Sequence, residues 1–528
     1  MGISEIRAAK ANEMKNGEMK NVPVGDGKEL LLCRIEDKYY ALAANCTHYG
    51  APLADGVLSG DRIVCPWHHA CFNAKTGSLL EPPAQDNLTK YETSVKNGDV
   101  FISVPDSEGE NQQGRNIVKA VKRDSSLYVV IGGGAGGNTA VQTLRQDGYN
   151  GKILLISQEN RAPYDRPNLS KEYLSGEVRE EWMPLRSGEF YEENDIELLL
   201  NKKVGKLDVK GKEIQFTDNE RIKFDKVLIA TGGKARRLNI HGENLNNVFT
   251  LRSFDDADRI IKAAGQAKNA VIIGASFIGL ETAYSLSKKK IPVTVISQEL
   301  IPFERVFGRE IGKLFKKLHE ENGVNFKLSR TLQAFEGKER VEAVSLEQGG
   351  RIETDMVILG IGVEPATEFI NGLNLLQDGS IRVNKYFNAS EDVYAAGDIV
   401  TIPDWRTGDD IRIEHWRTAL QQGRTAAHNM AGKETPFACI PFFWTDQLGL
   451  SLQYVGHAKD WEEIIIHGDV AAKDFISFYI KKDIVYAAAG CNRDKEMAAI
   501  EELMRLNKMP SASELKYNDV DFIGMLSE

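Results

Sequence analysis

Cysteine is scarce in this sequence, and its distribution is uneven. Six cysteines occur in 528 residues, too few for the disulfide framework of a small secreted protein. Four of the six lie within the first 71 residues, which indicates a metal site near the N-terminus. Cys33, Cys439 and Cys491 fit reduced core cysteines, since a free cysteine packs as a small apolar side chain.

Long apolar runs and an excess of positive charge are also absent. No stretch reaches the roughly 18 to 20 apolar residues of a membrane-spanning helix, and the first residues lack the apolar core of a signal peptide. We therefore expect a cytoplasmic protein without a membrane span. Lysine and arginine number 66 against 76 aspartates and glutamates, a net charge of −10. Because binding to phosphate backbones depends on clustered positive charge, we expect no nucleic-acid partner.

The residue patterns predict several domains. Short β-rich runs separated by glycine, asparagine and proline predict a small all-β domain at the start, followed by a polar stretch without apolar period. A strand, a glycine-rich turn, a helix and a second strand then follow, and this pattern recurs at 270–297. The predicted fold is multidomain: an all-β domain, two α/β Rossmann-like dinucleotide-binding domains and a C-terminal α+β domain. Their expected extents are 1–104 (all-β), 105–126 (linker), 127–250 with 385–432 (first dinucleotide-binding domain), 251–384 (second) and 433–528 (C-terminal).

Two short segments of the all-β part each offer one thiol and one imidazole. Cys46 and His48 form the first pair, and Cys65 and His68 form the second. Zinc is a competing occupant, because two cysteines and two histidines can also hold Zn²⁺ in a tetrahedral site. Zinc fingers, however, space cysteine with cysteine and histidine with histidine, whereas a Rieske [2Fe-2S] cluster has two cysteines on one iron and two histidines on the other. Cys–His pairs therefore favour the iron–sulfur cluster.

The segment CTHYGAPLADG…CPWHHACFNAKTG resembles the Rieske ferredoxin family, across roughly residues 20 to 104. The resemblance implies that Cys46 and Cys65 are thiolate ligands and that His48 and His68 are imidazole ligands of a [2Fe-2S] cluster.

Neighbouring residues refine this resemblance. His69 falls outside the ligand pattern and is expected at the surface or behind a ligand, and Cys71 has no assigned role. High-potential Rieske proteins add a disulfide at the positions of Ala51 and Trp67, so the resemblance implies the ferredoxin type. Its potential would lie toward the lower part of the roughly −150 to +300 mV Rieske range.

A dinucleotide fingerprint follows the first predicted strand of the α/β region. Gly132 allows a tight turn, Gly134 allows close approach of the backbone to a pyrophosphate, and Gly137 allows helix and strand to pack closely. The helix N-terminus would then face the phosphates. Glu159 stands at the end of the next predicted strand, where a carboxylate binds a ribose hydroxyl.

The second fingerprint is a variant of the first. It reads Gly274, Ser276 and Gly279, with serine at the middle glycine position. Serine is small enough for close backbone approach, so we predict the NAD(P)H site here. Glu299 lies two places beyond the end of the next predicted strand, and no arginine stands there to receive a 2′-phosphate. The pattern favours NADH and leaves NADPH open.

From residue 127 to nearly the C-terminus the chain resembles flavoprotein reductases with two dinucleotide folds. The resemblance is carried by PYDRP…LSK (163–171), ATGGKAR (230–236) and YAAGD (394–398). It implies FAD at the first fingerprint, with Asp398 on the ribityl chain and Arg166 and Arg236 at the phosphates or the ring. We assign Gly362 to the same cofactor-binding set.

The resemblance also implies a charged pair beside the flavin. Lys171 would lie near flavin N5, with Glu281, just beyond the second fingerprint, as its partner. A positive charge there stabilises electron density on a reduced ring. The alternative for Glu281 is an ordinary carboxylate on a helix surface. Trp416 matches a segment that walls the flavin, although aromatic residues more often form ordinary core.

No cysteine lies between Cys71 and Cys439, so the chain lacks the redox-active pair of the disulfide reductases that share this fold. It is most similar to apoptosis-inducing-factor-like and oxygenase-coupled ferredoxin reductases, in the first case including an N-terminal Rieske domain. The resemblance implies that NADH or NADPH reduces FAD, and that FAD passes single electrons to the cluster. The acceptor is open between an oxygenase, a redox carrier and a small molecule. Direct reduction of a small molecule at the flavin, a redox-signalling role and a homodimer also remain open.

Overall fold

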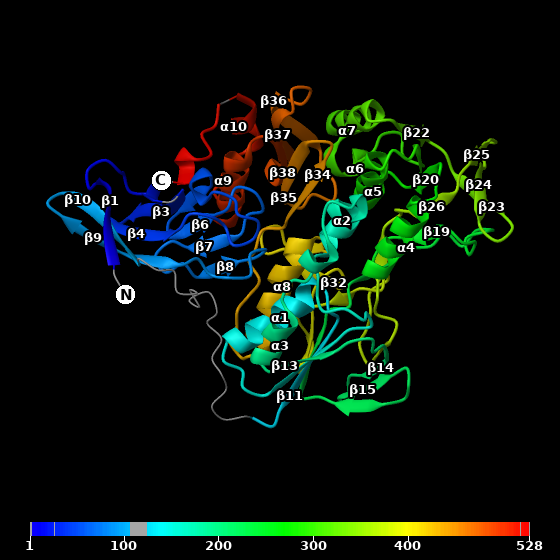
Figure 1. The fold of residues 1–528 in the computed structure, drawn as a ribbon, viewed down its shortest axis with the longest axis horizontal. Helices are drawn as coiled ribbons and strands as arrows, with labels where there is room; N and C mark the ends of the chain where they lie inside the picture. Colours follow the sequence, from blue (N-terminus) through cyan, green and yellow to red (C-terminus); the bar gives the residue numbers. More distant parts are fainter. Residues whose placement is uncertain (1–2, 26, 106–123, 518, 527–528) are drawn as a thin grey trace.

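The computed structural model describes residues 3–25, 27–105, 124–517 and 519–526. Within them the chain forms an all-β domain, two dinucleotide-binding domains on parallel sheets and a C-terminal α+β domain, which confirms the predicted fold class (Figure 1). Most of the expected linker, residues 106–123, lies outside the described residues. Among the described helices, none is long and apolar enough to cross a membrane.

The all-β domain consists of two antiparallel sheets, with strand orders β1-β10-β9-β4-β3-β2 and β5-β6-β7-β8. In β10, Val100 and Ile102 are fully buried while their neighbours are not, the alternation expected of a sheet with one buried face. The strands are β1 (Ile3–Lys10), β2 (Met19–Gly25), β3 (Lys28–Ile35), β4 (Lys38–Ala43), β5 (Val57–Ser59), β6 (Arg62–Val64), β7 (Cys71–Asn73), β8 (Leu79–Glu81), β9 (Lys90–Lys96) and β10 (Asp99–Pro105).

The first dinucleotide-binding domain has strand order β13-β12-β11-β17-β31-β30, parallel except for the edge strand β30. Val129, Val130 and Ile131 are consecutive and buried, as expected for a parallel strand covered on both faces. The strands are β11 (Leu127–Ile131), β12 (Lys152–Ile156), β13 (Ile196–Leu199), β17 (Lys226–Ile229), β30 (Asn388–Ser390) and β31 (Val393–Ala395), and the helices are α1 (Ala135–Gln146), α2 (Glu172–Ser175), α3 (Gly188–Glu193) and α8 (Trp416–Met430).

The second dinucleotide-binding domain is a parallel sheet of order β19-β26-β20-β21-β22. A separate antiparallel sheet, β23-β24-β25, accompanies it. The elements are β19 (Val248–Thr250), β20 (Ala270–Ile273), β21 (Val293–Ser297), β22 (Val324–Leu328), β23 (Leu332–Gly337), β24 (Val341–Leu346), β25 (Arg351–Glu353), β26 (Met356–Leu359), α4 (Phe254–Ala264), α5 (Phe277–Lys288), α6 (Glu304–Phe307) and α7 (Arg309–Glu321).

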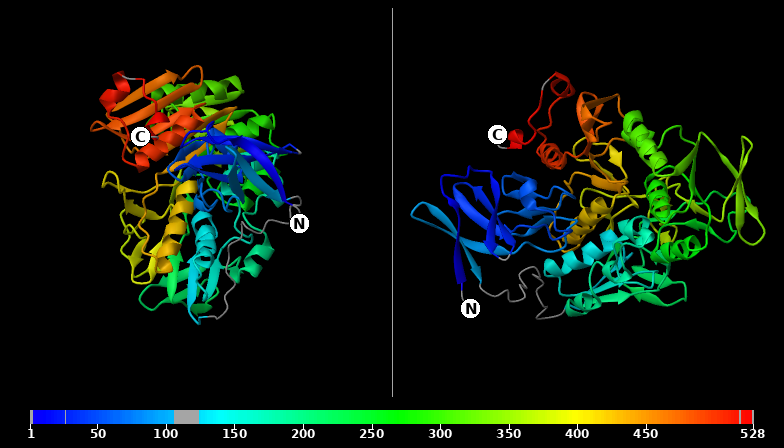
Figure 2. Two further views of the ribbon diagram at one scale, coloured as in Figure 1. Left: turned by 90° about the vertical axis from the view of Figure 1, so that its left-hand side faces the viewer. Right: turned by 45° about the horizontal axis from the view of Figure 1, so that its top comes forward.

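The C-terminal domain is an antiparallel sheet of order β34-β35-β38-β37-β36 with helix α9 against it. In both figures the all-β domain, in blue, adjoins this domain and α8 (Figures 1 and 2). The elements are β34 (Phe442–Gln447), β35 (Leu450–Gly456), β36 (Glu463–Asp469), β37 (Asp474–Lys481), β38 (Ile484–Cys491), α9 (Asp494–Arg505) and α10 (Ala512–Tyr517).

Strand pairing places two domain borders earlier in the chain than the sequence patterns do. Strand β19 pairs with β26, so residues 248–250 lie in the second sheet and not in the first domain. The chain also returns to the first domain before residue 385. The returning strands are β27 (Val363–Pro365), β28 (Ile370–Asn371) and β29 (Ile381–Arg382), which pair with β18 (Gly233–Ala235), β14 (Val204–Asp208) and β32 (Val400–Pro403). Strands of two or three residues are too short to show a period in the sequence.

Candidate redox site

Two loops at one end of the all-β domain present the predicted cluster ligands. In the first loop, the Cys46 N–H donates to the Ala51 carbonyl over 2.8 Å. In the second, the Cys65 N–H donates to the Ala70 carbonyl over 2.9 Å. Each loop is therefore closed by a hydrogen bond between residues five positions apart. Each loop also carries its histidine close to its cysteine in the sequence.

The four donor side chains are grouped by type. The His48 and His68 rings lie nearly perpendicular to each other with their Nδ1 atoms 3.1 Å apart, and the buried thiols of Cys46 and Cys65 are hydrogen-bonded to each other. Among the described residues, no three Cys, His, Asp or Glu side chains converge as a single metal ion would require. Two thiols beside two imidazoles match a cluster with cysteines on one iron and histidines on the other.

Burial prepares these groups for metal binding. It lowers the pKa of His48 to about 4 and also lowers that of His68, so both rings are neutral and keep a free lone pair at neutral pH. The hydrogen bond from the Cys46 thiol lowers the pKa of Cys65 and so favours its thiolate. The donor set therefore fits a [2Fe-2S] cluster.

The sequence left two positions open for His69, at the surface or behind a ligand, and the structure excludes the surface position. Its side chain is fully buried, its Nδ1 contacts Glu501, and its Nε2 lies 3.0 Å from Gln453 Oε1. The residue beside the predicted ligand His68 thus points into the C-terminal domain. Cys71 is buried in β7 and belongs to an apolar core.

The first fingerprint forms a tight glycine turn at the start of helix α1. Gly132 has φ +118°, which other residues rarely adopt, and a Cβ on Gly137 would lie 1.9 Å from the Gly132 carbonyl oxygen. Gly134 caps helix α1, and nothing lies within 4 Å of where its Cβ would be, so the helix N-terminus is accessible to a phosphate. Glu159 follows β12 and accepts hydrogen bonds from Arg166 (2.7 Å) and Tyr164 (2.6 Å).

The residues predicted to contact FAD outside the fingerprint are only partly together. Asp398 is largely buried and accepts a hydrogen bond from Arg252 over 3.0 Å. Arg252 was not singled out from the sequence, because an arginine outside every motif gives no signal there. Arg236 is exposed and binds the carbonyl oxygens of Val363 and Gly362 through its Nε and backbone N–H. It therefore faces the β27 strand in this structure.

The second fingerprint repeats the geometry of the first. Gly274 has φ +103°, and a Cβ on Gly279 would lie 2.2 Å from the Gly274 carbonyl oxygen. Ser276 caps helix α5, and its hydroxyl donates to the Gly360 carbonyl over 2.8 Å. The Glu299 N–H donates to the Ser297 hydroxyl, just as Glu159 does to Ser157 after the first fingerprint. Both glutamates are thus placed by the same turn.

Lys171 and Glu281 form a buried ion pair, 3.1 Å from Nζ to Oε1. Glu281 is not a surface carboxylate: only 6% of it is exposed, and it accepts hydrogen bonds from Ser170 (2.6 Å) and Thr445 (2.9 Å). Burial alone would lower the pKa of Lys171, but the Glu281 charge outweighs it and raises this pKa, so the amine remains protonated. Helices α2 and α5 and strand β34 meet at this pair.

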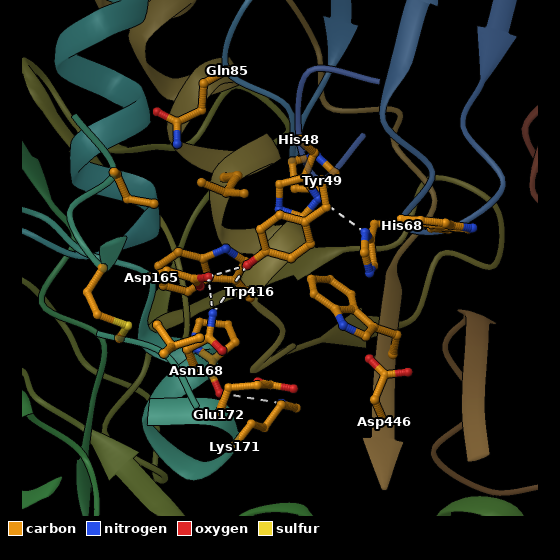
Figure 3. Close-up of a pocket in the computed structure, with 18 of the residues that line it drawn as sticks. His48, Tyr49, His68, Gln85, Asp165, Asn168, Lys171, Glu172, Trp416 and Asp446 are labelled. Carbon is orange, nitrogen blue, oxygen red and sulfur yellow. Dashed lines mark hydrogen bonds between the residues drawn. The ribbon is translucent and has the colours of Figure 1, made fainter. Parts of the chain in front are cut away.

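A cavity of about 770 Å³ joins the two halves of the site (Figure 3). His48 and His68 lie on its wall in the all-β domain, and Lys171 and Asp446 lie on its reductase wall. Trp416 and Trp444 also line it, and the centroid of the Trp444 ring lies 4.3 Å from that of the His68 ring. The lining also contains Tyr49 and Asp165, which hydrogen-bond to each other across the domain boundary.

A paired Cys–His donor set on an all-β domain and two dinucleotide cradles define a Rieske-type domain fused to a flavin-dependent pyridine nucleotide reductase. Residues 127–423 match the pyridine nucleotide-disulphide oxidoreductase family, residues 4–92 match the Rieske [2Fe-2S] domain, and residues 442–525 match the reductase C-terminal domain. The chain belongs to this oxidoreductase family, although its sequence has no cysteine between Cys71 and Cys439. It is a ferredoxin-reductase-type NAD(P)H flavoprotein oxidoreductase with FAD and a Rieske [2Fe-2S] centre.

Similar proteins match the chain over between 72% and 95% of its length. Apoptosis-inducing factor 3 of Homo sapiens is 35% identical over 95% of this chain and 84% of its own. A 3-phenylpropionate/cinnamic acid dioxygenase ferredoxin–NAD(+) reductase component of Photorhabdus laumondii is 33% identical over 72% of this chain and 96% of its own. The crystal structure of the covalent putidaredoxin reductase–putidaredoxin complex matches with a TM-score of 0.71 and 28% identity, over 76% of this chain and 98% of the other.

Proposed function

We propose that the chain carries electrons from NAD(P)H through FAD to its own Rieske cluster and then to an external acceptor. The observation that supports this most directly is the shared cavity, which has the cluster histidines on one wall and Lys171 on the other. Relatives that match only the reductase part are named as reductases of ferredoxin or rubredoxin. In this chain the electron-accepting domain is part of the same polypeptide.

We propose the following roles for the chain's own residues. FAD, when bound, accepts a hydride and releases electrons one at a time, which a [2Fe-2S] centre requires. The glycine turns at Gly132 and Gly274 bring the backbone close to the pyrophosphates of FAD and NAD(P)H. Asp398 holds the ribityl chain, and protonated Lys171, held by Glu281, stabilises negative charge on the reduced ring.

A second candidate function is direct reduction of a small molecule within the cavity. The cavity lies within the range of roughly 300–1,000 Å³ that is usual for small-molecule sites, at about 770 Å³. Its lining contains the aromatic rings of Tyr49, Trp67 and Trp182, all of which are substantially exposed. In that case the cluster would be accessory to the flavin.

Anaerobic titration with NADH and, separately, NADPH distinguishes the two functions. Flavin absorbance and the EPR signal of the cluster are followed in the same samples. The relay predicts that the flavin bleaches and that a Rieske-type EPR signal then grows, and the more effective nucleotide identifies the donor. A bleached flavin with a cluster that stays oxidised would contradict the relay and favour direct reduction. Sedimentation of the same purified protein tests whether it is a homodimer. Fractionation of the cells that produce it tests whether it is cytoplasmic.

A further inference from the structure

The contact between the all-β domain and the reductase contains a buried cluster of ionisable side chains. Six ionisable side chains meet where strands β6 and β8 face helices α8 and α9, and each of them is buried or only slightly exposed. We call this set the seat; its members are Arg62, His69 and Glu81 from the all-β domain and Arg417, Glu501 and Glu502 from the reductase.

Arg417 lies at the centre of the seat and is 1% exposed. Its Nε donates to the Pro82 carbonyl (2.9 Å) and its Nη2 to the His69 carbonyl (2.7 Å), so one guanidinium holds two segments of the all-β domain. The same Nη2 pairs with Glu501 over 2.9 Å. The His69 carbonyl belongs to the loop that carries the ligands Cys65 and His68, and Arg417 therefore fixes the position of that loop.

The carboxylates of the seat are matched to its arginines. Glu81 accepts from Arg62, lies 3.4 Å from Arg417, and accepts from Gln421, one turn further along α8, over 2.7 Å. Burial raises the pKa of Glu81, but the charges of Arg417 and Arg62 outweigh it, and the resulting pKa lies below the ordinary value. Charges this deeply buried are tolerated only when paired, so the seat requires both domains to be in place.

Apolar packing joins the domains around the seat. Val57, Val64 and Cys71 of the all-β domain belong to one continuous core with Phe442 and Val455 of the C-terminal domain. The His69 ring also stacks on Phe442 at 4.1 Å. A module that swings away would expose this core to water, at a cost proportional to its area.

A second contact between the two domains lies in the wall of the cavity itself. Arg186 of the reductase binds Asp86 through two nitrogens, each at 2.9 Å, and donates to the Gln85 carbonyl over 2.9 Å. The Tyr49 hydroxyl donates to Asp165 nearby. The reductase thus contacts both cluster loops, the first through Tyr49 and the second through the His69 carbonyl, and these contacts restrain the all-β domain together.

We propose that the Rieske domain is seated permanently on the reductase, with Arg417 as a positioning residue, so that the flavin and cluster sites keep one fixed geometry through turnover. The electron-transfer part of this inference rests on the proposed relay, but the seating itself does not. The connection between β10 and β11 would then be dispensable once the protein has folded.

The test is to cut that connection. A protease site is introduced between residues 106 and 123, and the purified holoenzyme is cleaved and passed over a sizing column at low salt and at about 1 M salt, where exposed ion pairs are screened. Permanent seating predicts that the two fragments elute together at both salt concentrations. It also predicts that NADH reduces the cluster at a rate within about twofold of the uncut protein and independent of protein concentration. Separation of the fragments, or a rate that falls on dilution, would overturn the proposal.

Arg417→Met in the cleavable protein tests the positioning role. We expect the Rieske fragment to dissociate about tenfold or more faster than in the parent and the EPR line shape of the reduced cluster to change, because the ligand loop loses its anchor. Arg382→Met is the matched control, since Arg382 forms an exposed ion pair with Asp410. If Arg417→Met behaves like this control, Arg417 does not position the Rieske domain.

If Arg417→Met does not fold, cleavage of the parent protein still decides whether seating is permanent. If the relay itself fails, the uncut parent also shows no cluster reduction, whereas co-elution still reports the seating.

Discussion

At the scale of single residues, Lys171 and Glu281 form a buried ion pair between two separate segments of the chain. The two residues lie 110 positions apart in the sequence. Because both side chains are buried, each remains charged only while the other is present as its partner. Glu281→Gln keeps the size of the side chain but leaves the Lys171 charge unpaired. We expect the free energy of unfolding to fall by about 3 kcal/mol, since removing one partner of a buried pair costs on the order of 3–5 kcal/mol. Glu177→Gln is the control because Glu177 pairs with Lys288 in an exposed position, where about 0–1 kcal/mol is expected. Equal losses, measured by denaturant unfolding, would show that the Lys171–Glu281 pair is not effectively buried.

The cysteines allow an equally local test of the cluster ligands. Cys46 and Cys71 are both buried, at 3% and 1% exposure, but of the two only Cys46 forms a hydrogen bond with a second thiol, that of Cys65. We expect Cys46→Ser to lose the iron and the Rieske EPR signal, and Cys71→Ser to keep both, because a hydroxyl is a much poorer ligand for iron–sulfur clusters than a thiolate. Iron analysis and EPR spectroscopy provide the measurement. Retention of the cluster in Cys46→Ser would refute the ligand assignment.

At the scale of elements, the two strand–turn–helix units make separable predictions. A Cβ at residue 137 or 279 would fall 1.9 or 2.2 Å from a backbone carbonyl oxygen, which neither helix can avoid without moving. We expect Gly137→Ala to lose bound FAD, and Gly279→Ala to keep FAD but to raise the KM for NAD(P)H by about tenfold or more, because helix α5 would move away from the nucleotide. Gly188→Ala, in the first turn of α3 with nothing within 4 Å, is the control. Flavin absorbance and steady-state kinetics give the readout, and loss of FAD in Gly279→Ala would show that the two cradles are not independent.

Some of these elements could be predicted from the sequence, and others could not. The fingerprints, the Cys–His pairs and the long strands follow from spacing and period, since their signals lie within about 20 residues. The brief strands β27 and β28 and the early return to the first domain carry no such signal. Arg252, Arg186 and Arg417 were missed for a related reason: an arginine gains its role from a partner that folding supplies, as Arg417 does from Glu81, more than 300 positions away.

At the scale of the whole molecule, the seat connects residues from both ends of the chain. Arg62 pairs with Glu81 within the all-β domain and with Glu502 near the C-terminus. The reductase thereby completes the charge balance of the Rieske domain, and the apolar core that both domains share surrounds it. Relative domain motion is the usual expectation where an interface is small and polar; here the apolar core and the paired charges argue against it. Acid should therefore weaken the assembly through this contact.

Glu81 makes the acid dependence testable. Its pKa lies below the ordinary value of 4.5 in the folded protein, so its contribution to stability is complete above pH 4.5 and is lost as the pH falls from 4.5 through the folded pKa. Glu81→Gln cannot ionise and should be less stable than the parent by about 3 kcal/mol at pH 7. Below pH 4.5 the difference between the two proteins should shrink toward zero, because the parent's Glu81 then also becomes neutral. Denaturant unfolding at pH 7, 5, 4 and 3 measures this difference, and Glu36→Gln, whose exposed carboxylate pairs with Lys75, serves as the control. A difference that stays constant down to pH 3 would show that the Glu81 carboxylate stabilises the seat through its shape rather than its charge.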